Sequence, residues 1–186
     1  MILDKIITLA LEEDLSLGDI TSDTVFSPAD RARAVIRAKE DLVLCGLPTA
    51  REVFGAVDSS VVFTPLKNEG DSVQKGEPVV EITGPVISIL KAERTALNFM
   101  QRMSATATLA KKFVDATKRY GTLILDTRKT TPGLRVFEKY AVTCGGGTNH
   151  RFGMYDRVLM KDNHRRLWKG GDPDQLDQAV VAARKA

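Results

Sequence analysis

The sequence has 186 residues, of which 43% are hydrophobic, 27% charged and 6% aromatic, and its formal net charge is +3. This composition predicts a globular protein of one or two domains with a buried core, and it excludes a disordered chain. No apolar run approaches the roughly 20 residues of a membrane helix, and the amino terminus lacks an apolar signal segment, so we expect a cytoplasmic protein that does not contact a membrane.

The first half of the chain predicts alternating helices and strands. Apolar residues at helical spacing open it, and a turn-like segment follows at residues 18–22. Alternation over residues 32–38 predicts a strand, and further patterns predict a short helix near 48–57 and strands near 60–65 and 78–82. Gly84 and Pro85 mark a break before residues 86–90.

A long helical pattern then extends from Ala92 to about Tyr120, with its start near residue 91. Its apolar stripe, which includes Met100 and Met103, is expected to pack in the core. Cys45 and Cys144 are far apart in the sequence and lie in no metal-ligand spacing, which predicts structural thiols in a reducing compartment.

In the second half, cations follow two short apolar runs. Residues 122–125 predict a strand buried on both faces of a parallel sheet, and Arg128 and Lys129 come directly after it. Thr131 and Pro132 predict an N-cap and a helix over residues 133–142. A second run, residues 158–160, leads into Lys161. Because ligands bind at the carboxyl ends of parallel strands, we expect these cations to converge.

The charge of the chain is concentrated in this region. Residues 126–169 contain ten Lys or Arg against four Asp or Glu, which gives this quarter a charge of +6. Such a cluster suits a polyanionic small molecule. The low aromatic content and the surrounding Gly, Thr and Asn argue against a base-stacking surface, so we expect no nucleic acid partner.

The candidate residues differ in their chemistry. Arg94, Arg128 and Arg151 remain protonated and offer planar forks that bind carboxylate or phosphate, whereas Lys129 and Lys161 supply compact charges. Glycines 145–147 allow backbone amides to approach an anion. Each feature also has an ordinary explanation: a lone helical arginine is more often solvated or ion-paired, and three glycines are more often a flexible loop. The two histidines lack the partners of a zinc site.

Taken together, the motifs at residues 93–99, 125–135, 144–151 and 161–164 closely resemble the quinolinate phosphoribosyltransferase family, also called nicotinate-nucleotide pyrophosphorylase (carboxylating). The opening segment around residues 13–22 is similar to this family as well. The resemblance implies an α/β fold. A sandwich-like (hammerhead) α+β domain would occupy residues 1–108, including the start of the long helix, and residues 109–186 would form the first βα units of an incomplete α/β barrel.

The family joins quinolinate to phosphoribosyl pyrophosphate, which releases pyrophosphate and carbon dioxide and gives nicotinate mononucleotide for NAD biosynthesis. By resemblance, Arg128 and Arg151 would hold the quinolinate carboxylates, with His150 and Lys161 beside them. Lys129 would face the phosphates and Thr127 would line the same site. Lys129 and Lys161 are the catalytic candidates. Arg94 would enter from the partner subunit of a homodimer.

A complete eight-stranded barrel takes roughly 250 residues, whereas this chain has room for two or three βα units after the long helix. The resemblance therefore places the acidic ligands of the Mg²⁺ that accompanies phosphoribosyl pyrophosphate beyond residue 186. We expect the 186-residue chain to be inactive on its own.

Two alternatives remain open at this point. The first is a related phosphoribosyltransferase of the molybdenum-transport-associated type, with a different substrate. The second is a carrier module, because residues 68–79 resemble a turn of lipoyl and biotinyl domains. A carrier needs a lysine at a hairpin tip, and Gly84-Pro85 offers none.

Overall fold

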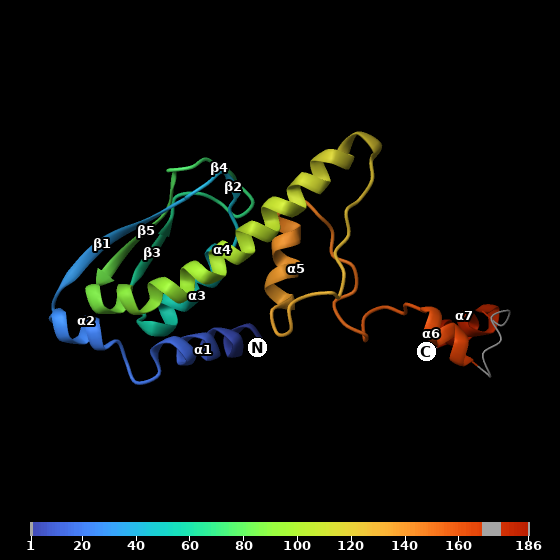
Figure 1. Cartoon of the computed structure of the whole chain (residues 1–186), viewed down its shortest axis with the longest axis horizontal. Helices are drawn as coiled ribbons and strands as arrows, with labels where there is room; N and C mark the ends of the chain where they lie inside the picture. The colour runs from blue at the N-terminus through green and yellow to red at the C-terminus, as the bar shows by residue number, and fades with distance from the viewer. Residues whose placement is uncertain (1, 169–175, 186) are drawn as a thin grey trace. The chain divides into compact units, whose positions relative to one another are not determined.

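The computed structural model describes residues 2–168 and 176–185. It divides into two compact units, Met1–His150 and Arg151–Ala186. The first unit contains helices packed on a small antiparallel sheet, and the described part of the second contains two helices. This mixed content agrees with the predicted α/β class (Figure 1).

The helices and strands of the first unit follow one another in a mixed order. In chain order they are α1 (Ile2–Leu15), α2 (Ile20–Val25), β1 (Arg31–Arg37), β2 (Leu42–Val43), α3 (Leu47–Val57), β3 (Val62–Pro65), β4 (Ser72–Val73), β5 (Pro78–Pro85), α4 (Val86–Thr117), a short 3₁₀ helix (Lys118–Tyr120) and α5 (Arg135–Cys144). The second unit holds α6 (Asp162–Leu167) and α7 (Leu176–Lys185).

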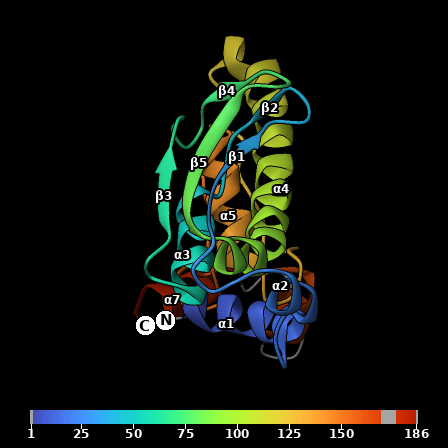
Figure 2. The same cartoon turned by 90° about the vertical axis from the view of Figure 1, so that its left-hand side faces the viewer.

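The main sheet has the strand order β1-β5-β3, with antiparallel pairing throughout. Ile82 lies opposite Ala34 on β1 and Phe63 on β3, and its side chain is fully buried. Helices α3 and α4 cover this face of the sheet (Figures 1 and 2). Val53 and Phe54 of α3 complete the core, because their apolar side chains are removed from water against the strands.

Helix α4 carries the predicted apolar stripe, with Met100, Met103 and Ala107 buried along it. It begins at Val86, earlier than the expected start near residue 91. Gly84 lies against Val61, where a Cβ would come within 3.1 Å, and Pro85 takes an extended conformation that ends β5. The chain therefore enters the helix directly after the proline.

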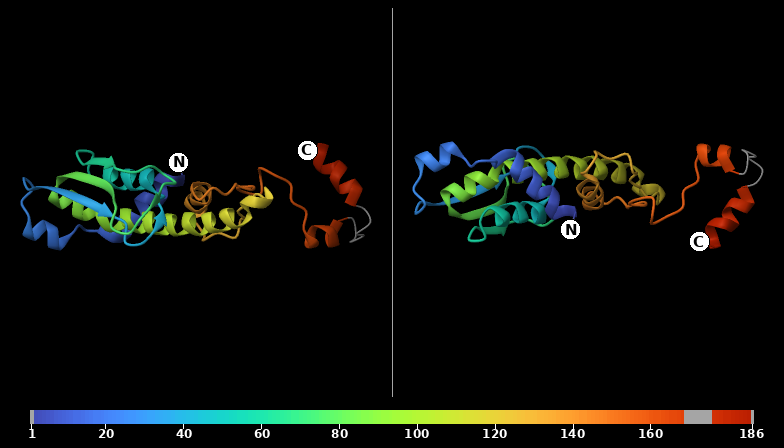
Figure 3. Two further views of the ribbon diagram at one scale, coloured as in Figure 1. Left: turned by 90° about the horizontal axis from the view of Figure 1, so that it is seen from above. Right: turned by 90° about the horizontal axis from the view of Figure 1, so that it is seen from below.

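Helix α5 crosses α4, and Figure 3 shows it nearly end-on beside α4. The contact is close because Gly145, just after α5, has no side chain: a Cβ there would lie 2.3 Å from the carbonyl oxygen of Ala107. The rings of Phe99 and Phe137 pack 4.9 Å apart between centroids in the same region. The glycine run thus serves as a packing surface at its first position.

Four sequence expectations are corrected. Residues 18–22 are not only a turn, because Asp19 caps α2 by accepting hydrogen bonds from the amides of Thr21 and Ser22. Residues 122–125 form only an isolated parallel bridge and are not buried on both faces, since Leu123 is 71% exposed. Residues 158–160 form no strand and are largely exposed. A buried parallel strand needs neighbours on both sides, and the described residues supply one bridge.

The fourth correction concerns α5, which begins at Arg135 and not at residue 133. The segment before it forms a turn in which the amide of Leu134 donates to the carbonyl of Thr131 (3.0 Å). Thr131 does not cap the helix with its hydroxyl; its own amide is bound by the carboxylate of Glu138 instead.

Within the described residues, no helix, α4 included, has an apolar stretch sufficient to traverse a bilayer.

Candidate active site

The two central motifs of the sequence lie side by side in the first unit. Leu125 and Thr148 form a parallel bridge, the amide of Thr148 donates to the carbonyl of Ile124 (2.8 Å), and the amide of Asp126 donates to the carbonyl of Thr148 (3.2 Å). The segment before Arg128 is therefore held next to the segment before His150. The convergence expected of Arg128, Lys129 and Lys161 stays a prediction, because Lys161 lies outside this junction.

A buried ion pair lies directly behind this junction. Lys139 of α5 binds Asp126, and their side chains are only 2% and 6% exposed. Asp126 Oδ1 also accepts the amide of His150 (2.9 Å), and Lys139 Nζ donates to the carbonyl of His150 (3.3 Å). With its side-chain amide nitrogen turned toward Asp126, Asn149 donates to Oδ2 (2.6 Å) and to the carbonyl of Lys139 (2.9 Å). The backbone at His150 is thereby fixed on both sides.

A second set of contacts shapes the loop that carries Arg128 and Lys129. Thr127 Oγ1 accepts the amide of Lys129 (3.0 Å), which closes a tight turn. Arg135 of α5 donates to Thr130 Oγ1 (3.1 Å) and to the carbonyl of Arg128 (3.4 Å). Since both ends of the loop are bound to α5, its conformation is set before any ligand arrives.

The carboxylate of Glu138 binds the end of the Arg128–Lys129 loop at Thr131. It accepts the amide of Thr131 (3.2 Å) and a hydrogen bond from Arg102 of α4 (3.2 Å). Burial is the largest single influence and raises the pKa of Glu138, but the hydrogen bonds from Thr131 and Arg102 together outweigh it and hold the pKa below 4.5. Glu138 is therefore a charged anchor at neutral pH.

The predicted side chains of the first unit differ in how they are engaged. Lys129 and Thr127 are exposed and available to solvent. Arg128 is half-buried, and its Nε is shielded from water without a hydrogen-bond partner among the described residues. A buried guanidinium nitrogen with an unmet donor is costly, so it favours an acceptor from outside the chain. Arg94 is exposed on α4, and the described residues provide it with no ion pair.

Arg151 and Lys161 belong to the second unit. Arg151 is buried, with 8% exposure, and donates to the carbonyl of Arg157 (3.4 Å). Lys161 stands just before α6: its amide donates to Nδ1 of His164 (3.2 Å), and its carbonyl accepts the amide of Arg165 (3.0 Å). Its side chain is exposed. That these two cations join Arg128 stays a prediction.

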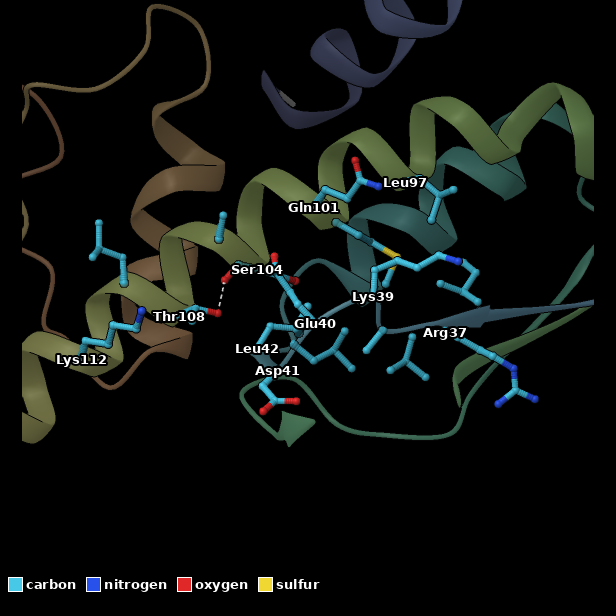
Figure 4. Close-up of a pocket in the computed structure, with 17 residues that line it drawn as sticks. Arg37, Lys39, Glu40, Asp41, Leu42, Leu97, Gln101, Ser104, Thr108 and Lys112 are labelled. Atoms are coloured by element: carbon cyan, nitrogen blue, oxygen red, sulfur yellow. Dashed lines mark hydrogen bonds between the residues drawn. The ribbon is translucent and has the colours of Figure 1, made fainter. Parts of the chain in front are cut away.

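A cavity of about 550 Å³ lies elsewhere in the first unit, between residues 36–44 and α4 (Figure 4). Arg37, Lys39 and Asp41 line it from one side, and Gln101 and Lys112 from the other. It includes none of the seven predicted site residues. Volume alone thus does not locate the chemistry, and the motif junction is the better candidate site.

Sequence reasoning missed the residues that support the site. Asp126, Lys139 and Glu138 were only counted in the charge balance, yet they position the two motif loops. No sequence pattern indicates that Lys139 is buried; the structure shows it, and a buried lysine almost always has a partner, here Asp126.

The described residues contain no cluster of three carboxylates that could hold, by itself, the magnesium ion that the resemblance implies. Among them, one group of three possible ligands approaches closely enough to hold a metal, and it consists of Cys45, Glu69 and Cys144. Thiols are poor ligands for Mg²⁺, which prefers oxygen. Asp126, the carboxylate nearest the motif junction, is already bound by Lys139 and by the amide of His150.

Comparison with known proteins decides the family. The profile described as "Quinolinate phosphoribosyl transferase, N-terminal domain" matches residues 19–104, and the profile of the C-terminal domain of the same family matches residues 106–186. The chain belongs to the quinolinate phosphoribosyltransferase family. Residues 68–79, which resemble a carrier turn, lie inside the match to the N-terminal domain of this family.

Curated relatives agree with this family. A probable nicotinate-nucleotide pyrophosphorylase [carboxylating] from Bacillus subtilis (strain 168) is 42% identical over 162 residues, which cover 87% of this chain and 56% of the relative. Quinolinate phosphoribosyltransferase [decarboxylating] 2b, mitochondrial, from Nicotiana tabacum is 44% identical over 163 residues. These residues cover 87% of this chain and 46% of the relative. The chain therefore spans about half the length of the curated relatives it matches.

Solved structures of the family show the same fold. The match to NadC from Streptococcus pyogenes has a TM-score of 0.91 and 39% sequence identity. It covers 97% of this chain and 64% of the NadC chain. The match to the nicotinate-nucleotide pyrophosphorylase from Francisella tularensis has a TM-score of 0.90 and 39% sequence identity. It covers 98% of this chain and 64% of that protein.

Proposed function

We propose that this chain provides part of the quinolinate site of a quinolinate phosphoribosyltransferase, which forms nicotinate mononucleotide from quinolinate and phosphoribosyl pyrophosphate. The observation that carries the proposal is the junction of the two motifs, where a buried Asp126–Lys139 pair fixes the backbone at His150 beside the loop of Arg128. The names of the relatives support the same reaction.

Arg128 is the clamp for a quinolinate carboxylate in this proposal. Its guanidinium has a shielded Nε without a partner in the described residues, and a carboxylate of the substrate would accept that hydrogen bond. Arg151, His150 and Lys161 complete the binding of the dicarboxylate. Arg94, exposed on α4, is proposed to reach the site of the partner subunit in a homodimer.

Lys129 and Thr127 are assigned to the phosphoribosyl side. The Thr127–Lys129 turn presents an exposed ammonium group, which offsets the charge that develops on the departing pyrophosphate. The ring nitrogen of quinolinate bonds to the ribosyl carbon as pyrophosphate leaves. The bond to the adjacent carboxylate then breaks, carbon dioxide departs, and the positively charged ring nitrogen stabilises the electron pair until the carbon is protonated. The cations contribute mainly by positioning both substrates.

Mg²⁺ enters this proposal with phosphoribosyl pyrophosphate. The described residues contain no group of three carboxylates that could hold it without the substrate, so no step is assigned to it in this chain. The cytoplasmic location also stays a prediction, and the names of some plant relatives place those proteins in mitochondria or chloroplasts.

Calorimetry of the 186-residue chain tests the clamp. We expect quinolinate to bind at least tenfold more tightly than nicotinate, because the second carboxylate is needed to occupy the cationic site. Arg128→Lys should weaken quinolinate binding about tenfold or more, since an ammonium group cannot reproduce the bidentate fork. The matched control is Arg33→Lys, an exposed arginine on β1 that pairs with Glu81.

Two results would count against the proposal: equal affinity for quinolinate and nicotinate, or unchanged quinolinate binding in Arg128→Lys. Chromatography of reaction mixtures addresses the separate prediction about length. The chain alone should produce no nicotinate mononucleotide, and measurable product would show that expectation to be wrong.

A further inference from the structure

Three possible metal ligands from separate parts of the first unit meet away from the motif junction. Cys45 lies between β2 and α3, Glu69 lies in the connection between β3 and β4, and Cys144 is the last residue of α5. Their ligand atoms all lie within 4.8 Å of one another. No local sequence pattern reveals this cluster, because the two cysteines are 99 positions apart.

The surrounding backbone holds these ligands in place. Glu69 accepts hydrogen bonds from the amides of Gly46 (2.9 Å) and Leu47 at the start of α3. The amide of Cys45 donates to Ser104 Oγ (3.0 Å), and the same hydroxyl donates to the carbonyl of Cys45 (3.1 Å). Metal ligands are characteristically oriented by such outer hydrogen bonds, which prepare them for an ion.

The chemistry of the cluster calls for a cation. The two thiols interact with each other and with Glu69, and Cys144 also interacts with the hydroxyl of Tyr140; none of these groups is positively charged. The carboxylate of Glu69 is held by the amides of Gly46 and Leu47, and the described residues give it no ion pair. A divalent ion would neutralise the carboxylate and the two thiolates that form on binding.

We propose that Cys45, Glu69 and Cys144 bind a thiophilic divalent cation, with Zn²⁺ as the natural occupant. Tetrahedral zinc with bonds of about 2.3 Å to sulfur and about 2.1 Å to oxygen separates a sulfur from an oxygen ligand by about 3.6 Å. Cys144 Sγ donates a hydrogen bond to Glu69 Oε2 at 3.5 Å. An ion that replaces the thiol proton would find these two ligand atoms at nearly the separation it requires.

Access to the site is from the side of α5. Cys45 is fully buried, whereas Cys144 and Glu69 are half-buried and Tyr140 is 39% exposed. The fourth position would be open to water or to the Tyr140 hydroxyl. An ion bound there would join the β2–α3 connection, the β3–β4 connection and the end of α5. It would thereby stabilise the first unit just before the glycine run at residues 145–147.

Titration with Co²⁺ tests this site without any enzyme assay. The reduced chain, stripped with a chelator, should develop thiolate-to-cobalt and tetrahedral absorption bands at a ratio of one ion per chain, and Zn²⁺ should abolish them. Cys144→Ser and Cys45→Ser should each weaken binding at least tenfold, and Glu69→Gln should weaken it less. The matched control, Glu77→Gln, removes a carboxylate of similar exposure whose partners are Lys67 and the amide of Gln74.

Thermal unfolding of the unaltered chain gives a second measurement, so that a variant that fails to fold does not decide the matter. Zinc should raise the unfolding midpoint, because an ion that binds only the folded state stabilises it. The proposal is wrong if the folded, reduced chain shows no cobalt bands and no zinc-dependent shift. It is also wrong if Cys144→Ser binds Co²⁺ as tightly as the unaltered chain. A third contradicting result would be a disulfide between Cys45 and Cys144 that forms as fast with zinc as without it. Each of these results is independent of quinolinate binding.

Discussion

Lys139 and Asp126 form an ion pair across the join between α5 and the first motif loop, almost completely shielded from water. The same aspartate oxygen accepts the amide of His150, and the same ammonium group donates to the carbonyl of His150. One pair thus determines the backbone path of two loops. Its value lies in positioning, because the removal of two charges from water offsets most of their mutual attraction.

Lys139→Met should destabilise the chain strongly. The variant keeps much of the volume of the side chain but leaves Asp126 buried without its cation, and we expect the free energy of unfolding to fall by about 3 kcal/mol or more. Urea denaturation measures this change. Lys111→Met is the control, because the Lys111–Asp115 pair on α4 is exposed and should contribute less than about 0.5 kcal/mol. Equal losses in the two variants would contradict the assigned role.

Ser104→Ala should weaken the contact between α4 and the β2–α3 connection. Ser104 is buried, and its hydroxyl satisfies both the amide and the carbonyl of Cys45. Loss of the hydroxyl leaves two buried backbone groups unpaired, which costs about 1–3 kcal/mol. Denaturant unfolding of Ser59→Ala provides the comparison, since Ser59 is exposed and its loss should be nearly neutral. A neutral Ser104→Ala would mean that water replaces the hydroxyl.

Gly145→Ala should disrupt the packing of α5 on α4. The new Cβ would lie 2.3 Å from the carbonyl of Ala107 and 2.8 Å from the Cβ of Ala110, and backbone must move to relieve the first contact. We expect a loss of about 1–3 kcal/mol or more. Gly55→Ala is the opposite case. Gly55 lies in α3 with open space around it, so a stabilisation of about 0.5–1 kcal/mol is expected from its higher helix propensity. Chemical denaturation of both variants should give opposite signs.

Glu138→Gln should change the dependence of stability on pH. The pKa of Glu138 is held below its ordinary 4.5 in the folded chain, so its carboxylate adds stability above pH 4.5, and that stability is lost as the pH falls through the folded value. Thermal unfolding from pH 7 to pH 3 should therefore show the wild type more stable at neutral pH and the two curves converging in acid. A constant difference at all pH values would exclude this charge effect.

Helices α1, α3 and α4 and strands β1, β3 and β5 were predictable because their hydrophobic patterns are local, whereas α2, β2 and β4 were not predicted. The stripe of α4 with Met100 and Met103 and the alternation on β1 needed no tertiary information. Helix starts were less predictable. The start of α5 depends on Glu138 binding the amide of Thr131 from seven residues away, which a local capping pattern does not reveal.

The candidate site was predictable in its motif residues and not in their supports. Arg128, Lys129 and His150 stand in short motifs, whereas the partners Asp126 and Lys139 are joined only after α5 has packed. The apolar runs at 122–125 and 158–160 were misread for a related reason. Such a run predicts burial only when other strands and helices are there to cover it, and Leu125 remains 50% exposed in the described structure.

Helix α4 passes without interruption through residue 105, where one family profile ends and the next begins. The boundary between the two family domains is consequently not a boundary of folding. Met103 and Ala107 lie one turn apart on either side of it, and both are buried in the same cluster. A chimera spliced at this point would have to graft half a helix and its neighbours in α5, so exchange of domains between relatives should succeed only when the whole helix travels with one parent.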